Sequence, residues 1–346
     1  MKTIITAWDA LSASGRGLDD HVGALGGDVT VGGGDEPRLV SGFDIEVALG
    51  RRGTRAMERS TGLAVETTGR LLDRVGLGRE NRTPDADDEL GIVLSVCDGT
   101  QAIVDFANDT WVYAKPYQVN PAKIPANLMN FHAGQCAIWH RLRGPNATVC
   151  GGPAGGLLAL NYARRLQRGG HARTLLCGAV EEYSAARVKY EVAQSVTSEQ
   201  RAFGEGCVVF LVESDRPKGA SREPLADLLA VEFGAYTRLD TIDTALSECI
   251  RRALRRTDVK ADKVRVVAPS PGVGLRGRAE LAAISDVFGR IRLATSGLDA
   301  LGDTGAAAAG FQIVELLIGP GEPGRIAMAT TSDDEGRVGC ALLRIW

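Results

Sequence analysis

The residues best placed to do chemistry lie within residues 146–170, where a short predicted strand meets a helix. The glycines at 151–152 permit a sharp reversal, and Pro153 fits the first turn of the following helix. Residues 154–163 are apolar on nearly every helical face, which is typical of a helix inside a protein. The free N–H groups at such a helix N-terminus would activate a nucleophile. This position holds Pro153, whose side chain has no nucleophilic atom.

This turn resembles the nucleophile turn of β-ketoacyl synthases, members of the thiolase-like superfamily. Residues 148–157 read Thr-Val-Cys-Gly-Gly-Pro-Ala-Gly-Gly-Leu, and the family motif is Thr-Val-Asp-Thr-Ala-Cys-Ser-Ser-Gly-Leu. Aligning the two places the family's catalytic cysteine at Pro153. Residues 43–53, 142–146 and 203–213 resemble further segments of the same family.

The resemblance implies that the other catalytic groups are also missing. A ketosynthase needs two histidines and a lysine beside its cysteine. Their positions correspond to Pro269 for the first histidine, Gly297 for the lysine and Gly302 for the second histidine, or Asp303 after a one-residue slip. No histidine follows His171, so the C-terminal half cannot supply an imidazole. The sequence therefore predicts a condensing-enzyme fold without catalytic residues.

Three groups near this predicted centre could still react. Cys150 lies three residues before the nucleophile position, and we interpret it as a buried structural thiol. Glu280 and Asp303 are carboxylates, which in such places are more often helix-start or solvated groups than catalysts. The four histidines form no ligand spacing with the seven cysteines, so the sequence predicts neither a metal site nor a cofactor.

Composition excludes several other classes of function. The chain has 346 residues and a net charge of −3, and its Lys and Arg residues do not gather into a strip with interleaved aromatics, which argues against nucleic-acid binding. No apolar run reaches the roughly 20 residues that cross a bilayer. The N-terminal apolar run is too short for a signal peptide, so we expect a cytoplasmic protein that does not engage a membrane.

Strands and helices alternate along most of the chain, which indicates an α/β protein with helices on both sides of a sheet. The resemblance implies a thiolase-like fold: two similar βαβ-rich halves, residues 1–215 and 222–346, in an α/β/α/β/α arrangement. Residues 79–88 are predicted to form a charged surface loop. Strands are expected at 3–8, 90–96, 147–150, 174–180, 203–213, 225–231, 264–267, 291–295, 326–330 and 339–345, and helices at 57–77, 100–108, 126–142, 154–168, 241–256, 278–288 and 305–318.

A ketosynthase-like chain without catalytic groups resembles the chain length factor of type II polyketide synthases. Such a subunit pairs with an active ketosynthase, shapes the acyl tunnel, and meets the acyl carrier protein only indirectly. For Trp111, Trp139 and Phe131, a core role is as good an interpretation as an interface role. The candidates for the tunnel or interface are Ile103, Val104, Phe106, Trp111, Tyr113 and Phe131.

Two other functions remain open from the sequence. The chain could be an acyltransferase or hydrolase with a relocated nucleophile, for which Cys150 is the candidate. It could also be a homodimeric scaffold that binds acyl chains. Labelling of the isolated protein would distinguish the first alternative, and its mass with and without a ketosynthase would distinguish the second.

Overall fold

The computed structural model describes residues 2–26, 36–55, 57–97, 100–194, 202–214, 222–270, 272–294 and 296–346. In this part of the chain, eleven strands form one mixed sheet in the order β4-β3-β5-β6-β1-β7-β11-β10-β8-β9, with β2 paired to β1. The strands are β1 Thr3–Ser12, β2 Gly15–Arg16, β3 Leu90–Val96, β4 Asn146–Val149, β5 Thr174–Glu181, β6 Gly206–Ser214, β7 Ala226–Ala235, β8 Val264–Ala268, β9 Arg292–Leu293, β10 Arg325–Ser332 and β11 Arg337–Ile345.

The two ends of this sheet repeat one topology. In the first half, β3 pairs in parallel with β4 and β5, and β6 and β1 then add antiparallel. In the second half, β8 pairs in parallel with β9 and β10, and β11 and β7 add antiparallel. Only the register pairs Ile4↔Asp227 and Ile5↔Ala226 join β1 to β7. The predicted boundary between the halves includes residues 215–221, which lie outside the described residues, so that division stays a prediction.

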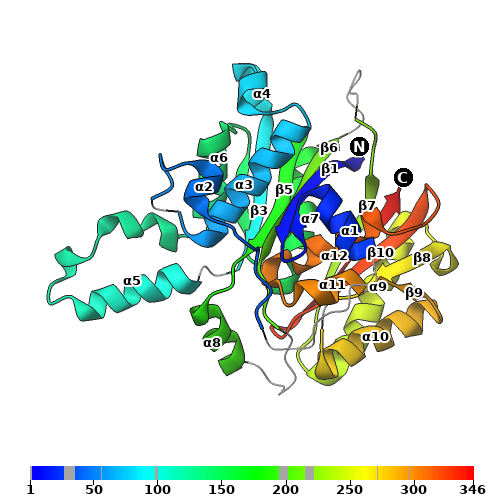
Figure 1. Cartoon of the computed structure of the whole chain (residues 1–346). Coiled ribbons are helices and arrows are strands. Elements are labelled where there is room, and N and C mark those ends of the chain that lie inside the picture. The colour runs from blue at the N-terminus through cyan, green and yellow to red at the C-terminus, as the bar shows by residue number, and fades with distance from the viewer. Residues whose placement is uncertain are drawn as a thin grey trace.

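Helices separate and cover the two halves in five layers (Figure 1). One apolar core lies between the first half-sheet and α3 and α6, and another lies between the second half-sheet and α9 and α10. A third, central core holds α7 and α12 between the two half-sheets. The predicted α/β/α/β/α order is confirmed. The helices are α1 Leu18–Gly26, α2 Ile45–Leu49, α3 Arg59–Arg74, α4 Pro84–Glu89, α5 Thr100–Val112, α6 Phe131–His140, α7 Gly155–Arg168, α8 Ala185–Gln194, α9 Ile242–Thr257, α10 Gly274–Phe288, α11 Ser296–Leu301 and α12 Ala308–Ile318.

The two central helices cross at glycines, as their small residues predict. A Cβ atom on Gly156 of α7 would lie 2.7 Å from the backbone nitrogen of Gly310 in α12. Each helix also follows a short 3-10 turn that opens on a left-handed glycine, Gly152 with φ 49° and Gly305 with φ 47°. Only glycine adopts this conformation without strain. The two halves therefore present the N-termini of their central helices to each other through equivalent turns.

Local signals changed some predicted boundaries. The predicted charged loop at 79–88 is wrong, because α4 begins at Pro84 with Thr83 as its N-cap, whose hydroxyl accepts a hydrogen bond from the Ala86 N–H. The helix expected at 100–108 continues to Val112. Conversely, the helix expected at 126–142 covers only Phe131–His140. None of the helices in the described ranges is long and apolar enough to cross a membrane.

Candidate functional site

The position expected for a nucleophile is occupied by Pro153 at the centre of the molecule. Pro153 belongs to the 3-10 turn Gly152–Ala154 that leads into α7. This turn contacts the equivalent turn Gly305–Ala307 before α12, and it contacts β10 and β11. The N-termini of α7 and α12 therefore converge there, yet the proline ring offers no group that could attack a thioester.

The other three positions that correspond to catalytic residues lie at the ends of neighbouring elements. Pro269 is buried directly after β8. Gly297 is buried in α11, with its N–H 3.5 Å from Oε1 of Glu315. Gly302 follows α11 with φ 69°, and a Cβ atom on it would lie 2.5 Å from the carbonyl oxygen of Ala202. At Gly302, therefore, any histidine side chain would require the backbone to move.

Glu280 is a structural carboxylate, and the interpretation of it as a helix-start or solvated group is wrong. It lies inside α10 and is 1% exposed. Its carboxylate accepts hydrogen bonds from the Ser270 N–H at 2.8 Å, the Thr330 hydroxyl at 2.6 Å and the Ser332 hydroxyl at 2.9 Å, and also from the Ser270 hydroxyl. Buried charge requires such compensation. Glu280 therefore ties α10 to the ends of β8 and β10.

Asp303 belongs to an ionic cluster around the buried Arg187. The Arg187 guanidinium lies 3.4 Å from Oδ1 of Asp303, 2.6 Å from Oε1 of Glu191 and 3.9 Å from Oε1 of Glu181. Asp303 Oδ1 also accepts the Gly305 N–H at 2.8 Å. Burial raises the pKa of Glu191 to about 7. Since its Oδ1 atom bonds both the turn before α12 and the buried Arg187, Asp303 fixes this turn.

Three of the four imidazoles are structural groups, of which His21 and His132 are buried and His140 is half-buried. His132 bonds the Ser60 hydroxyl at 2.9 Å, and burial lowers its pKa to about 4. His21 lies 2.8 Å from the Ser12 hydroxyl, and His140 lies 2.8 Å from the Val65 carbonyl oxygen. Burial lowers the pKa of both. These histidines stay neutral at pH 7 and hold hydroxyl or backbone groups.

Cys150 is exposed, so its interpretation as a buried thiol is wrong. It follows β4, which is the edge strand of the sheet, and edge strands leave one side uncovered. Its sulfur lies 3.7 Å from the sulfur of Met129, which is also exposed. Cys150 therefore marks the surface beside β4. Among the described residues, no group of three His, Cys, Asp or Glu side chains could hold a metal ion.

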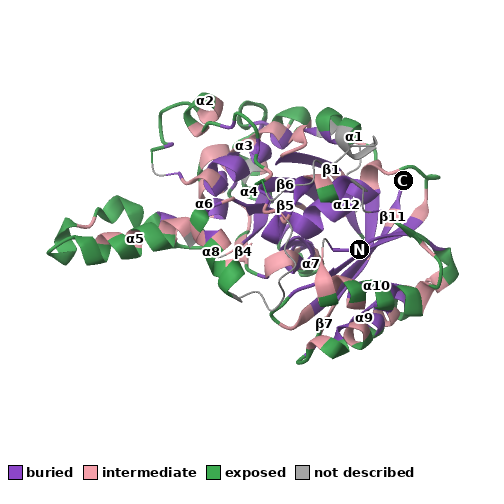
Figure 2. Cartoon of the chain, turned by 60° about the horizontal axis from the view of Figure 1, so that its bottom comes forward, coloured by how far each residue is buried: buried purple, intermediate pink, exposed green. Residues whose placement is uncertain are grey.

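A projecting segment beside β4 exposes nine large apolar side chains. We call residues 100–130 the apolar arm: α5 followed by three 3-10 turns that begin at Pro116, Pro121 and Pro125. Figure 1 shows the arm projecting from the body, and Figure 2 shows that most of its residues are exposed. Its exposed large apolar residues are Ile103, Val104, Trp111, Val112, Tyr113, Tyr117, Ile124, Leu128 and Met129.

All six tunnel or interface candidates lie on the arm or at its junction with α6. Ile103, Val104 and Tyr113 are exposed, and Trp111 is 90% exposed, so the core interpretation of Trp111 is wrong. Phe106 and Phe131 are half-buried. Trp139, in contrast, packs against the first outer core, and its ring lies 3.0 Å from where a Cβ atom on Gly53 would be.

Sequence reasoning missed the extent of this arm. Its apolar residues between Val112 and Met129 follow no helical or strand period, and three prolines interrupt them. The absence of a period was the signal that could have indicated an arm. A segment with no apolar helix face or strand face has no surface to pack onto the body of the protein. The Lys123 ammonium and the Asp109 carboxylate, 2.6 Å apart, instead hold the arm to itself.

Comparison with known proteins gives matches over much or all of the chain. The family model described as "Beta-ketoacyl synthase, N-terminal domain" matches residues 40–216. The solved structure described as "The ishigamide ketosynthase/chain length factor" is 36% identical in sequence, covers 100% of this chain and 99% of its own, and has a TM-score of 0.85.

Curated relatives are more distant. "Putative polyketide beta-ketoacyl synthase 2" of Streptomyces coelicolor is 26% identical over 321 residues, which are 83% of this chain and 75% of that protein. The 3-oxoacyl-acyl-carrier-protein synthase 2 of Vibrio cholerae is 24% identical over 186 residues, which are 53% of this chain. That second alignment spans only 42% of the Vibrio protein.

Proposed function

Because the chain belongs to the β-ketoacyl synthase family, we propose that it is a chain length factor, a non-catalytic subunit of a type II polyketide synthase that pairs with an active ketosynthase. The observation that carries this proposal is the apolar arm beside the open strand β4. Trp111 and Val112 are 90% and 80% exposed and belong to a group of nine exposed large apolar residues in one segment, and such grouping is typical of an interaction surface.

The centre of the fold supports a non-catalytic role. Pro153 cannot form an acyl thioester, and the carboxylates of Glu280 and Asp303 are committed to structural hydrogen bonds. The described imidazoles of His21, His132 and His140 each hold a hydroxyl or a backbone carbonyl. In the proposed complex the ketosynthase supplies the thiolate and the proton-transfer groups, and the carrier protein delivers acyl chains to that partner.

The arm and the edge strand provide the surface for this partner. Obligate interfaces bury more than about 2,000 Å² and are apolar, like a core cut in half. The arm offers aromatic and aliphatic residues of the types enriched at such interfaces. Cys150 and Met129 extend the same surface to the end of β4. In this arrangement Ile103, Val104 and Phe106 on α5 would line the acyl channel and set its depth.

Co-expression with an active ketosynthase of a type II polyketide synthase tests the pairing. We expect a 1:1 complex by native mass measurement, and we expect Val112→Asp to dissociate it, because burying an unpaired carboxylate in an apolar interface is costly. The matched control is Val47→Asp, since Val47 is 85% exposed but lies on α2, outside the arm. A homodimer that ignores the ketosynthase would contradict the proposal and favour an acyl-binding scaffold.

One observation keeps a second function in view. The exposed thiol of Cys150 is accessible to an acyl donor, as an acyltransferase or hydrolase with a relocated nucleophile requires. Turnover by the chain alone that disappears in Cys150→Ala would establish this function. Under the primary proposal the thiol instead lies beneath the partner subunit, and its modification should be slow in the complex.

A further inference from the structure

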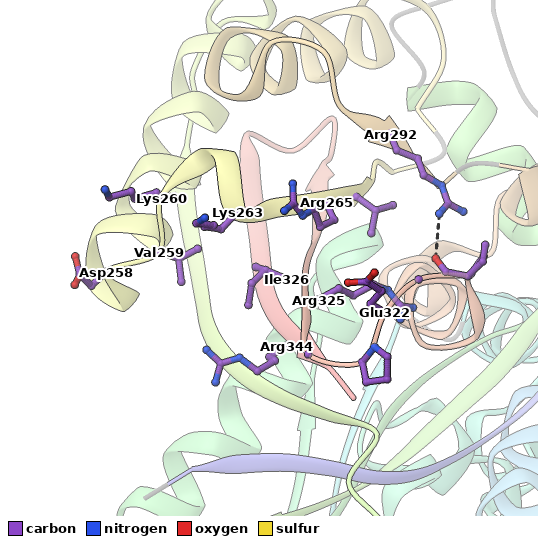
Figure 3. A pocket seen from close by; sticks show the side chains of 15 residues that line it. Asp258, Val259, Lys260, Lys263, Arg265, Arg292, Glu322, Arg325, Ile326 and Arg344 are labelled. Carbon is purple, nitrogen blue, oxygen red and sulfur yellow. Dashed lines mark hydrogen bonds between the residues drawn. The ribbon is translucent and has the colours of Figure 1, made fainter.

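A large cavity lies in the second half, at the ends of the strands that point away from the centre around Pro153. Its volume is about 860 Å³, and its walls come from the segment before β8, from β8 to β11 and from the turn before β10 (Figure 3). Arg325, the first residue of β10, lines this cavity, whereas Ser332, the last residue of β10, bonds Glu280 near the centre. Eight strand residues span roughly 23 Å, so the cavity is separate from the centre.

The lining of the cavity is strongly basic. Four separate segments contribute cationic side chains, and two carboxylates, Asp258 and Glu322, accompany them. In Figure 3, Ile326 lies between Arg265 and Arg344, so charged groups flank an apolar side chain. The six cationic residues are Lys260, Lys263, Arg265, Arg292, Arg325 and Arg344.

The protein holds several of these cations in place without neutralising them. Arg325 donates to the carbonyl oxygens of Leu316 and Gly319 at 2.8 and 2.7 Å, and Arg292 donates to the Pro320 carbonyl oxygen at 3.0 Å. Carbonyl oxygens position a guanidinium but carry no full charge. Within the described part of the chain, no ion pair joins any of the six cations to a carboxylate.

The uncompensated positive charge affects the guanidinium of Arg325. Burial and the neighbouring Arg292 lower the pKa of Arg325. Its Nε atom is buried and has no hydrogen-bond partner among the described residues. Like charges that crowd without counter-charges disfavour the compact state, and an anionic ligand would remove that penalty.

We infer that this cavity binds a phosphate-bearing organic anion of nucleotide size. The phosphates would contact the guanidinium and ammonium groups, which are the side chains that recognise phosphate. The organic part would pack on Val259, Ile326 and Pro323. The volume lies within the range of small-molecule sites, whereas a protein helix needs a long open groove.

Calorimetric titration of the purified full-length protein, with its partner if the two co-purify, tests this inference, with ATP as the probe. At 0.15 M salt we expect saturable 1:1 binding with Kd below about 1 mM. The double variant Arg265→Ser/Arg344→Ser should weaken binding at least about tenfold, because two charge-assisted contacts are lost. The control is Arg255→Ser, since Arg255 is an exposed arginine on α9 of the same half that does not line the cavity.

Three results would overturn the inference. The first is no saturable binding of ATP. The second is binding that the double variant leaves unchanged. The third is equal affinity for inorganic tripolyphosphate, which would show that the site recognises phosphate alone and that its apolar residues contribute nothing. Binding of an acidic carrier protein that the double variant abolishes, with no ATP binding, would identify a protein-docking surface instead.

Discussion

Single residues carry our proposal that the centre of this molecule is structural. Pro153 occupies the position that the resemblance assigns to the nucleophile. Both oxygens of Glu280 accept hydrogen bonds from backbone and hydroxyl groups, and Oδ1 of Asp303 contacts the Gly305 N–H and Arg187. The proline and glycine residues at the positions that the resemblance assigns to catalytic groups could be identified from the sequence. The exposure of Cys150 could not, because its small and β-branched neighbours indicate a strand but not whether that strand lies at the sheet edge.

His132 gives the residue-scale prediction. Its pKa falls from 6.5 to about 4 in the folded protein, so between these values the unfolded chain binds more protons. Stability should therefore decrease as pH falls, by about 2 kcal/mol between pH 7 and pH 5 for this group. The pH dependence of the urea midpoint measures it.

The variant His132→Gln should be less stable at pH 7 but should lose less stability on going to pH 5. Burial also lowers the pKa of His21 and His140, so part of the dependence should remain. His171→Gln, at an exposed position, controls for removal of an imidazole. An identical pH slope in the wild type and His132→Gln would contradict the assignment of His132 as a buried neutral group.

At the scale of elements, the apolar arm is where sequence and structure differ most. The start of α5 at Thr100 could be predicted from the apolar residues that follow, whereas its extension to Val112 and the three proline turns could not. Tertiary packing usually decides which apolar residues are buried, and for the arm that packing lies on another molecule in our proposal. The sequence of one chain therefore could not show that these apolar side chains are exposed, because in our proposal the surface that covers them belongs to the partner.

Phe106 gives the element-scale prediction. It is half-buried on α5, where the proposed channel would end. Replacing Phe106 by Ala removes most of a phenyl ring, so the complex with its ketosynthase should make longer acyl products. Mass spectrometry of the products measures the shift. Val47→Ala, on α2 and outside the arm, is the control, and an unchanged product distribution in Phe106→Ala would remove this residue from the channel.

At the scale of the whole molecule, the repeated topology was the most predictable feature. The continuous apolar run of β3 and the single apolar faces of α3 and α9 could be recognised from the sequence, and the resemblance to the β-ketoacyl synthases implied their arrangement in layers. The basic cavity could not be predicted from the sequence, because its cations are spread over residues 260–344 and meet only when four segments fold together. The joining of the two half-sheets through β1 and β7 could not be predicted from the sequence either.

In our proposal the whole molecule is a condensing-enzyme fold with no reactive centre. Steady-state turnover of a malonyl or acyl thioester by the purified chain alone tests this claim most directly, with the ketosynthase complex as the positive control. We predict thiol release at the rate of the buffer blank for the chain alone, and condensation only in the complex. Multiple turnovers by the isolated chain, whether or not Cys150→Ala abolishes them, would contradict it.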